Sequence, residues 1–341
     1  MRPPCCIGTG HSSDDTRVAG YVDKGHAERM TPEDFHQSIV SDPDALAVHL
    51  TAVEHEVAIE NCGASLHCHC MAVDANGRVK PKRLAEFMRG AILDYAIPRS
   101  RAQEARERDM RQRSSRATTE LYEEARGLFT DLVKSGEGGE LLLYILAEQY
   151  LGIPQIFSKM SLKTDRRHHY NGADGVHATM ANDGTLKLFW GESKIYGDAT
   201  SAIRDCLSSM SPFLLQEESE QAEREEDLLL LRDHVDFGNA TFTEALKRRF
   251  DRSSPLSNTV QYCGIALVGF DADFYPGNGV NKVAQDVLDA AKLGLDRWAS
   301  SVGRRLASER LERFEIEFLL VPLPSADGFR AAFREALGIT E

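Results

Sequence analysis

Apolar residues recur along the chain first at strand-like and then at helix-like spacing. Residues 45–79 alternate apolar and polar positions and include the turn sequence DANG at 74–77, so we predict paired strands there. Residues 81–97 carry apolar positions at helical spacing, and Pro98 ends this helix because it disfavours the helical conformation of the residue before it. Further helices are predicted over about 117–134, 140–151, 199–215, 281–308 and 326–337.

The second half of the chain predicts a β-hairpin and two buried strands. Residues 174–196 show a hairpin pattern around the turn sequence NDG, and the apolar runs at 262–270 and 314–324 are typical of buried strands. Because strands alternate with helices, we predict an α/β fold whose sheet is covered by helices. Residues 1–35 are rich in Gly, Pro, Ser, Asp and His without periodicity, so we expect a weakly ordered N-terminal extension.

Charge is unevenly distributed over an acidic chain. The net charge of −13 argues against a general nucleic-acid coat protein, but it leaves room for an enzyme with a local basic cleft. Residues 99–116 hold seven arginines against three acids. This run fits either a solvated helix with i,i+4 ion pairs or a face that contacts phosphates or a partner.

Cysteine usage and hydropathy indicate a soluble, cytoplasmic protein. The odd count of seven cysteines argues against a secreted disulfide framework. The run CGASLHCHC at 62–70 lacks the paired spacing of a zinc site, so we expect buried cysteines alternating with half-exposed histidines. No apolar run approaches the ~18 residues of a membrane span, and the N-terminus lacks the apolar core of a signal peptide.

The stretch WGESKIYGD at 190–198 carries the strongest candidate chemistry. Strand alternation places Glu192 and Lys194 on one face. If the hairpin turn is centred on Asp183, Asp174 falls directly opposite Glu192. Two opposed carboxylates repel unless a positive charge lies between them, and either the lysine or a Mg²⁺ ion could supply it. The alternative is an idle salt bridge on a surface strand.

An acid pair beside a lysine suits metal-dependent phosphodiester hydrolysis. A metal would polarise the scissile phosphate and help to generate hydroxide, and the lysine could orient the attacking water. Glu140 follows GEGG at the start of the most apolar helix, where it is either a further ligand or an acid that complements the helix dipole. The loop at 158–174 is either simply solvated or a source of phosphate contacts. The candidate contacts are Lys159, Lys163, Arg166, Arg167 and His168.

These residues occur in a recognisable order. Three short motifs follow one another: GE at a helix start, GxDxxH with Gly172, Asp174 and His177, and GESK. Their order resembles the E…D…ExK arrangement of the PD-(D/E)xK nuclease superfamily. The longer context, GELLLYILAEQYLGIPQIFSKMSLKT, HYNGADGVH and LFWGESKIY, resembles the HamA family of nuclease subunits from the Hachiman anti-phage defence system. The resemblance is best over about 120–215. Gly-Ala-Asp stands where the superfamily usually has a proline before the aspartate.

The resemblance implies a fold, an activity and a partner. It implies a restriction-endonuclease-like core with a mixed central sheet flanked by helices within 116–341, which leaves 36–115 as an accessory, partner-docking region. It also implies cleavage of DNA with Mg²⁺, or Mn²⁺ as an alternative, under the control of the helicase subunit HamB. Carried over to this chain, Asp174, Glu192 and Glu140 would be metal ligands and Lys194 the catalytic lysine.

Two functions therefore remain open at this point. One is a metal-dependent DNA nuclease that acts as the effector of a defence complex. The other is a catalytically inactive nuclease-fold module that binds DNA or regulates a partner. The chain has no GxxxxGK[ST] phosphate loop, HExxH zinc signature or GxSxG nucleophile elbow, so the sequence offers no support for other hydrolase classes.

Overall fold

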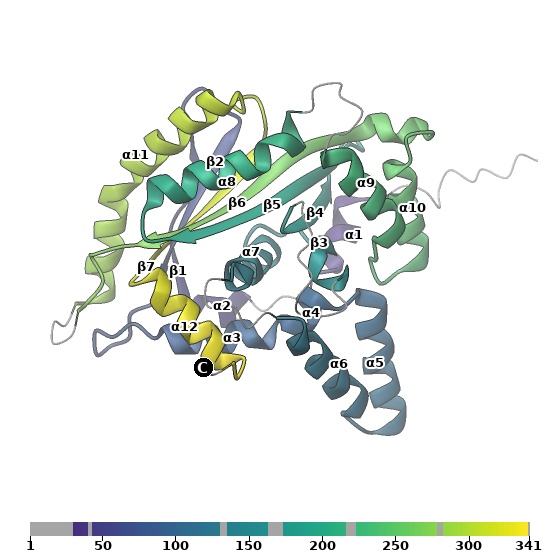
Figure 1. The fold of residues 1–341 in the computed structure, drawn as a ribbon, viewed down its shortest axis with the longest axis horizontal. Helices are drawn as coiled ribbons and strands as arrows, with labels where there is room; N and C mark the ends of the chain where they lie inside the picture. Colours follow the sequence, from purple (N-terminus) through teal and green to yellow (C-terminus); the bar gives the residue numbers. More distant parts are fainter. Residues whose placement is uncertain are drawn as a thin grey trace, which may run out of the picture.

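A mixed β-sheet forms the centre of the protein (Figure 1). The computed structural model describes residues 30–39, 43–129, 135–162, 173–215, 223–277 and 282–339. The strands within these ranges form one seven-stranded sheet in the order β1-β2-β7-β6-β5-β4-β3. The β2–β7, β7–β6 and β6–β5 pairs are parallel, and the other pairs are antiparallel. The strands are β1 (Leu50–Ala58), β2 (Ala64–Met71), β3 (Gln155–Ser158), β4 (Gly175–Met180), β5 (Leu186–Tyr196), β6 (Val260–Asp271) and β7 (Ile316–Leu323).

Helices cover both faces of this sheet. The long helices α8 (Ala199–Leu214) and α11 (Ala284–Glu309) lie on one face, and α7 (Glu137–Gln149), α3 (Pro81–Gly90) and α12 (Ala326–Ala336) lie on the other (Figure 1). The predicted α/β class, with a mixed sheet flanked by helices, is confirmed. No helix in the described ranges has the length and apolar character needed to cross a membrane. The remaining helices are α1 (Pro32–Gln37), α2 (Pro43–Ala47), α4 (Ile92–Ala96), α5 (Arg99–Gln112), α6 (Arg116–Gly127), α9 (Glu223–His234) and α10 (Ala240–Phe250).

Helix α1 begins within the last residues of the range 1–35, which the sequence assigns to a weakly ordered extension. Thr31 caps the helix through a reciprocal capping box with Asp34. Phe35 is fully buried and meets Phe237 and Phe242 edge-on at ring-centroid distances of 5.3 and 5.2 Å. Burial of this aromatic ring holds the helix to the fold more strongly than its local composition suggests. Residues 1–29 of the predicted extension lie outside the described part of the chain.

The N-terminal strands belong to the same sheet as the rest of the protein. β2 pairs in parallel with β7, some 250 residues further along, so the range 36–115 contributes directly to the central sheet. The docking role assigned to that range stays a prediction. His67 and His69 of β2 are 3% and 2% exposed, so the expectation of half-exposed histidines is wrong. The ring of Tyr150 covers them, with centroid distances of 5.5 and 4.2 Å.

The arginine-rich run forms α5 and packs against α6 as a helical hairpin (Figure 1). Five of its seven arginines make ion pairs, either along the hairpin or to neighbouring elements. The interpretation as a helix laced with ion pairs therefore accounts for most of the charge. The five paired arginines are Arg99, Arg101, Arg106, Arg111 and Arg116.

Helix α7 is buried along nearly its whole length and lies close against β5. It begins at Glu137, one turn earlier than the sequence predicts, and includes Gly138 and Gly139. A Cβ atom at Gly139 would lie 2.3 Å from Ser193 Oγ and 3.1 Å from Ile195 Cδ1. Gly139 therefore lets the start of α7 approach the strand, despite the poor helix propensity of glycine.

Gly139→Val is expected to lower the free energy of unfolding by about 1–3 kcal/mol, because the added atoms overpack the contact between α7 and β5. The measurement is urea unfolding followed by circular dichroism. Gly90→Val at the end of α3 is the matched control, since a Cβ there meets no atom within 4 Å. Equal effects of the two substitutions would contradict the close approach.

Candidate active site

The hairpin that carries the candidate residues pairs in the predicted register. Gly175 pairs with Gly191 and Met180 with Leu186, so the two residue numbers always sum to twice 183. The turn is closed by hydrogen bonds between Ala181 and Thr185 and from the Gly184 N–H to the Ala181 carbonyl. Gly184 has a φ of +88°, a conformation that favours glycine. Asp174 lies one position beyond this ladder, and its charge raises the pKa of Glu192, so the two carboxyl groups are close to each other.

β5 continues past the point where β4 ends. The last ladder bond runs from the Asp174 N–H to the Gly191 carbonyl at 2.9 Å. The next N–H of β5 on this edge, that of Ser193, donates to Asp174 Oδ2 at 2.9 Å. The carboxylate thus takes the place of a strand partner, and the sheet edge itself fixes its position.

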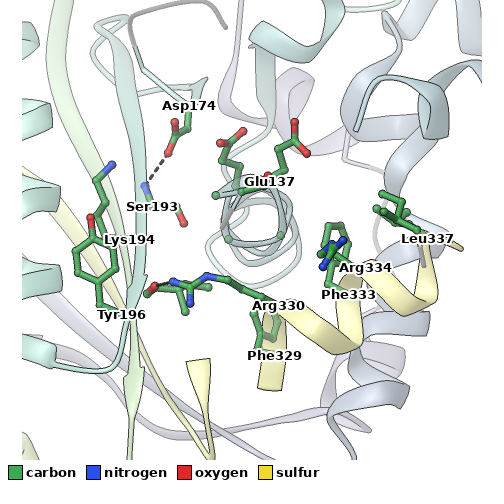
Figure 2. A pocket seen from close by; sticks show the side chains of 17 residues that line it. Glu137, Asp174, Ser193, Lys194, Tyr196, Phe329, Arg330, Phe333, Arg334 and Leu337 are labelled. Carbon is green, nitrogen blue, oxygen red and sulfur yellow. Dashed lines mark hydrogen bonds between the residues drawn. The ribbon is translucent and has the colours of Figure 1, made fainter. Parts of the chain in front are cut away.

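Glu192 and Lys194 form an ion pair on one side of β5. The lysine ammonium donates to Glu192 Oε1, and the side chains of Lys194 and Glu192 are 22% and 7% exposed. Figure 2 shows Lys194 and Tyr196 on one side of the strand and Ser193 on the side that faces α7, as strand alternation requires. The strand therefore presents chemistry to both sides of the sheet at its open edge.

Burial and mutual charge perturb these groups strongly. Burial and the nearby charge of Asp174 raise the pKa of Glu192 to about 7, and burial likewise raises the pKa of Asp174 despite Lys194 and Lys159. Burial opposes the charge of Lys194, but Glu192 and Asp174 outweigh it and raise the lysine pKa. Two carboxyl groups that resist ionising together beside a charged lysine are typical of functional sites.

Glu140 lies in the first turn of α7, in the same pocket as Asp174 and Lys194. Its Oε2 accepts a hydrogen bond of 3.2 Å from the hydroxyl of Tyr95. Burial, followed by the charges of Glu140 and Asp174, raises the pKa of Tyr95 well above its usual range, so the phenol stays a donor. The glutamate is thus placed beside the hairpin acids by the helix start.

Lys159 belongs to the same cluster, although the sequence assigned it to a phosphate-contacting loop. It lies in a short 3₁₀ turn (Lys159–Leu162) after β3. Burial lowers its pKa, partly offset by the charges of Asp174, Asp227 and Glu192. The other predicted contacts, Lys163, Arg166, Arg167 and His168, lie outside the described residues.

Asp227 is a candidate site residue that sequence reasoning missed. It is 5% exposed, and its Oδ2 accepts a hydrogen bond of 3.3 Å from the N–H of Ala173, next to Asp174. In the sequence it ends the acidic run 216–227, which resembles a solvated surface. Asp227 stands directly before the apolar run Leu228–Leu231. This position could have indicated its burial, because an acid at the start of a buried helical stretch is itself a candidate for burial.

The oxygen ligands of this cluster fit a divalent cation only in part. Asp174 and Glu192 are the acid pair, and Mg²⁺ usually takes one or two carboxylates and completes its shell with water and substrate oxygens. No set of three or more His, Cys, Asp or Glu side chains within the described ranges is close enough to hold an ion. In this arrangement Glu140 is bonded to Tyr95 and Glu192 to Lys194, which keeps the predicted third ligand apart from the pair.

An α/β protein with Asp174, Glu192 and Lys194 at the open end of a hairpin resembles the PD-(D/E)xK class in its architecture and in the order of these residues. The chain matches the HamA family over residues 48–337 and belongs to that family. The family is part of the Hachiman system, so the protein has a role in anti-phage defence. No curated protein matches the chain.

The contribution of Glu192 to the stability of the metal-free protein is expected to fall as the pH rises from about 5 to 8. The pKa of Glu192 rises from 4.5 to about 7 on folding, so the folded state holds a proton that the unfolded state has already lost. This contribution is complete below pH 4.5 and is lost as the pH passes 7. Urea unfolding in EDTA across this range provides the measurement.

Glu192→Gln should remove this pH dependence, because the amide is neutral at every pH. Glu104→Gln on the exposed face of α5 is the control and should leave the wild-type slope in place. A wild-type stability that rises from pH 5 to 8 relative to the Glu192→Gln variant would contradict the raised pKa.

Proposed function

We propose that the protein is a metal-dependent deoxyribonuclease, the effector of its defence system. One observation carries the proposal: the carboxylate of Asp174 is bonded to the N–H of Ser193, next to Glu192 on β5, and Lys194 is ion-paired with Glu192. A fold has no structural need for a buried and a half-buried carboxylate at one point of a sheet edge, since such a pair costs stability. Phosphodiester hydrolysis does need them.

Asp174 and Glu192 would hold the divalent cation, Mg²⁺ or Mn²⁺. The bound ion supplies polarisation of the scissile phosphate and a water of lowered pKa. Glu192 must lose its proton to become a ligand, and its pKa of about 7 makes this possible at neutral pH. A direct ligand role for Glu140 remains a prediction, and its part in the proposal is to hold a water or the ion from the start of α7.

Lys194 would orient the attacking water and stabilise the charge that develops on the phosphate. Its raised pKa keeps the ammonium charged throughout the physiological range. When a cation neutralises Glu192, the ammonium becomes available to the substrate. Asp227 and Ser193 would position Asp174: Asp227 accepts a hydrogen bond from the backbone of Ala173, and the N–H of Ser193 donates to the carboxylate of Asp174.

DNA and the helicase HamB are the proposed partners. An effector that cut cellular DNA freely would harm its host, and a net charge of −13 limits unassisted binding to DNA. We therefore place the control of access to the site in the helicase.

Plasmid degradation tests the proposal. The purified chain is incubated with plasmid DNA, with and without HamB and ATP, in Mg²⁺ or EDTA. We expect metal-dependent loss of DNA, and Glu192→Gln and Lys194→Met should each reduce the rate by about a hundredfold or more. Lys187→Met is the matched control, because Lys187 is on the same strand, is similarly buried and also pairs with a glutamate, Glu315.

Intact DNA under every condition, with an active helicase present, would overturn the nuclease proposal. The inactive DNA-binding or regulatory module would then be the better description. Equal losses for the Lys187 and Lys194 variants would show that strand stability, and not chemistry, was being measured.

A further inference from the structure

A cavity of about 220 Å³ opens beside the acid cluster, between the start of α7, the end of β5 and α12 (Figure 2). Asp174, Glu137 and Glu140 contribute its acidic side, at the hairpin and the first turn of α7. Arg330 and Arg334 contribute its basic side, from α12. The cavity therefore separates negative from positive charge over the width of one pocket.

The two arginines lie one helical turn apart, so both are on the face of α12 that lines the pocket. The Arg330 guanidinium donates to the Ile195 carbonyl, immediately after Lys194, and to Asp327 Oδ1 at 2.7 Å. These bonds fix it across the gap between α12 and β5, with 22% of its side chain exposed. Arg334 is likewise only partly exposed.

Apolar side chains of α12 and β5 line the cavity beside these guanidinium groups. Phe329, Phe333 and Leu337 come from α12 and its C-terminal end, and Ile195 comes from β5. A pocket with planar guanidinium donors above apolar walls suits a sugar-phosphate unit, because guanidinium groups bind phosphate oxygens in pairs and the sugar packs on apolar atoms.

We propose that Arg330 and Arg334 bind a phosphate of the nucleic-acid strand, next to the phosphate held at Asp174 and Glu192. This inference rests on the proposed function and names part of its substrate site. Asp174 lines the acidic end of the pocket and adjoins the proposed cation site, and the basic end holds the neighbouring phosphodiester. Residues from the C-terminal helix thereby set the position of the strand relative to the acids.

The test is binding of a fluorescent single-stranded or duplex oligonucleotide to the full chain in EDTA, where metal-dependent cleavage cannot occur. Anisotropy titrations are run between about 20 and 150 mM salt. Arg334→Gln should weaken binding about tenfold and reduce the slope of log K against log salt by about 0.7 to 0.9. Arg334→Lys should keep the slope and recover part of the affinity, because it keeps the charge but loses the paired geometry.

Arg313→Gln is the matched control, since Arg313 is an exposed arginine before β7, at the opposite end of that strand from α12. Inorganic phosphate and a mononucleotide are added as competitors. If a mononucleotide displaces the oligonucleotide at an equal concentration, the pocket binds a free nucleotide and the strand-phosphate inference is overturned.

The inference and the proposed function fail in different ways. An unchanged affinity and salt slope for Arg334→Gln, or no binding by the wild type at about 20 mM salt, overturns the inference even if the protein cuts DNA. Binding that depends on Arg334, without any cleavage of DNA, supports the inferred phosphate site and overturns only the proposed nuclease activity.

Discussion

The candidate site depends on one local constraint: β5 is longer than the strand beside it. Where β4 ends, the N–H of Ser193 would be left without a strand partner, and the carboxylate of Asp174 takes it. This bond holds the first acid beside Glu192 on β5, without any flexible linker between them. Everything else at the site is arranged around this pair. Lys194 and Lys159 supply positive charge, and Asp227 fixes the backbone that carries Asp174.

The glycine-rich start of α7 is the second requirement. Side chains at Gly138 and Gly139 would collide with α12 and β5, so only glycine lets the helix begin this close to the strand. The same turn carries Glu137 and Glu140 into the pocket, and α12 packs against it with Phe329 and Phe333. The glycines thus bring the acids of α7 and the arginines of α12 to opposite sides of one cavity.

Much of this arrangement could be predicted from the sequence because it is local. The NDG turn sets the hairpin register, and alternation then places Glu192 and Lys194 on one face. The contacts that the sequence did not reveal are long-range. Asp227 reaches Ala173 from a helix more than 50 residues away, and Arg330 reaches Ile195 across 135 residues. The histidines of β2 were misjudged for the same reason, since Tyr150, which buries them, is remote in sequence.

The existing partners of the charged groups at the site bear on when the proposed metal and substrate can bind. Several charged groups at the site already have partners in this structure: Glu192 is bonded to Lys194, Glu140 to Tyr95 and Arg330 to Asp327. A cation or a phosphate must therefore displace an existing partner before it can bind, and each displacement costs free energy. Substrate and metal together replace both sets of partners at once, whereas either alone replaces only half. Under the proposed function, such a site would favour binding of the metal and the DNA together, which is the condition that a partner delivering a strand would create.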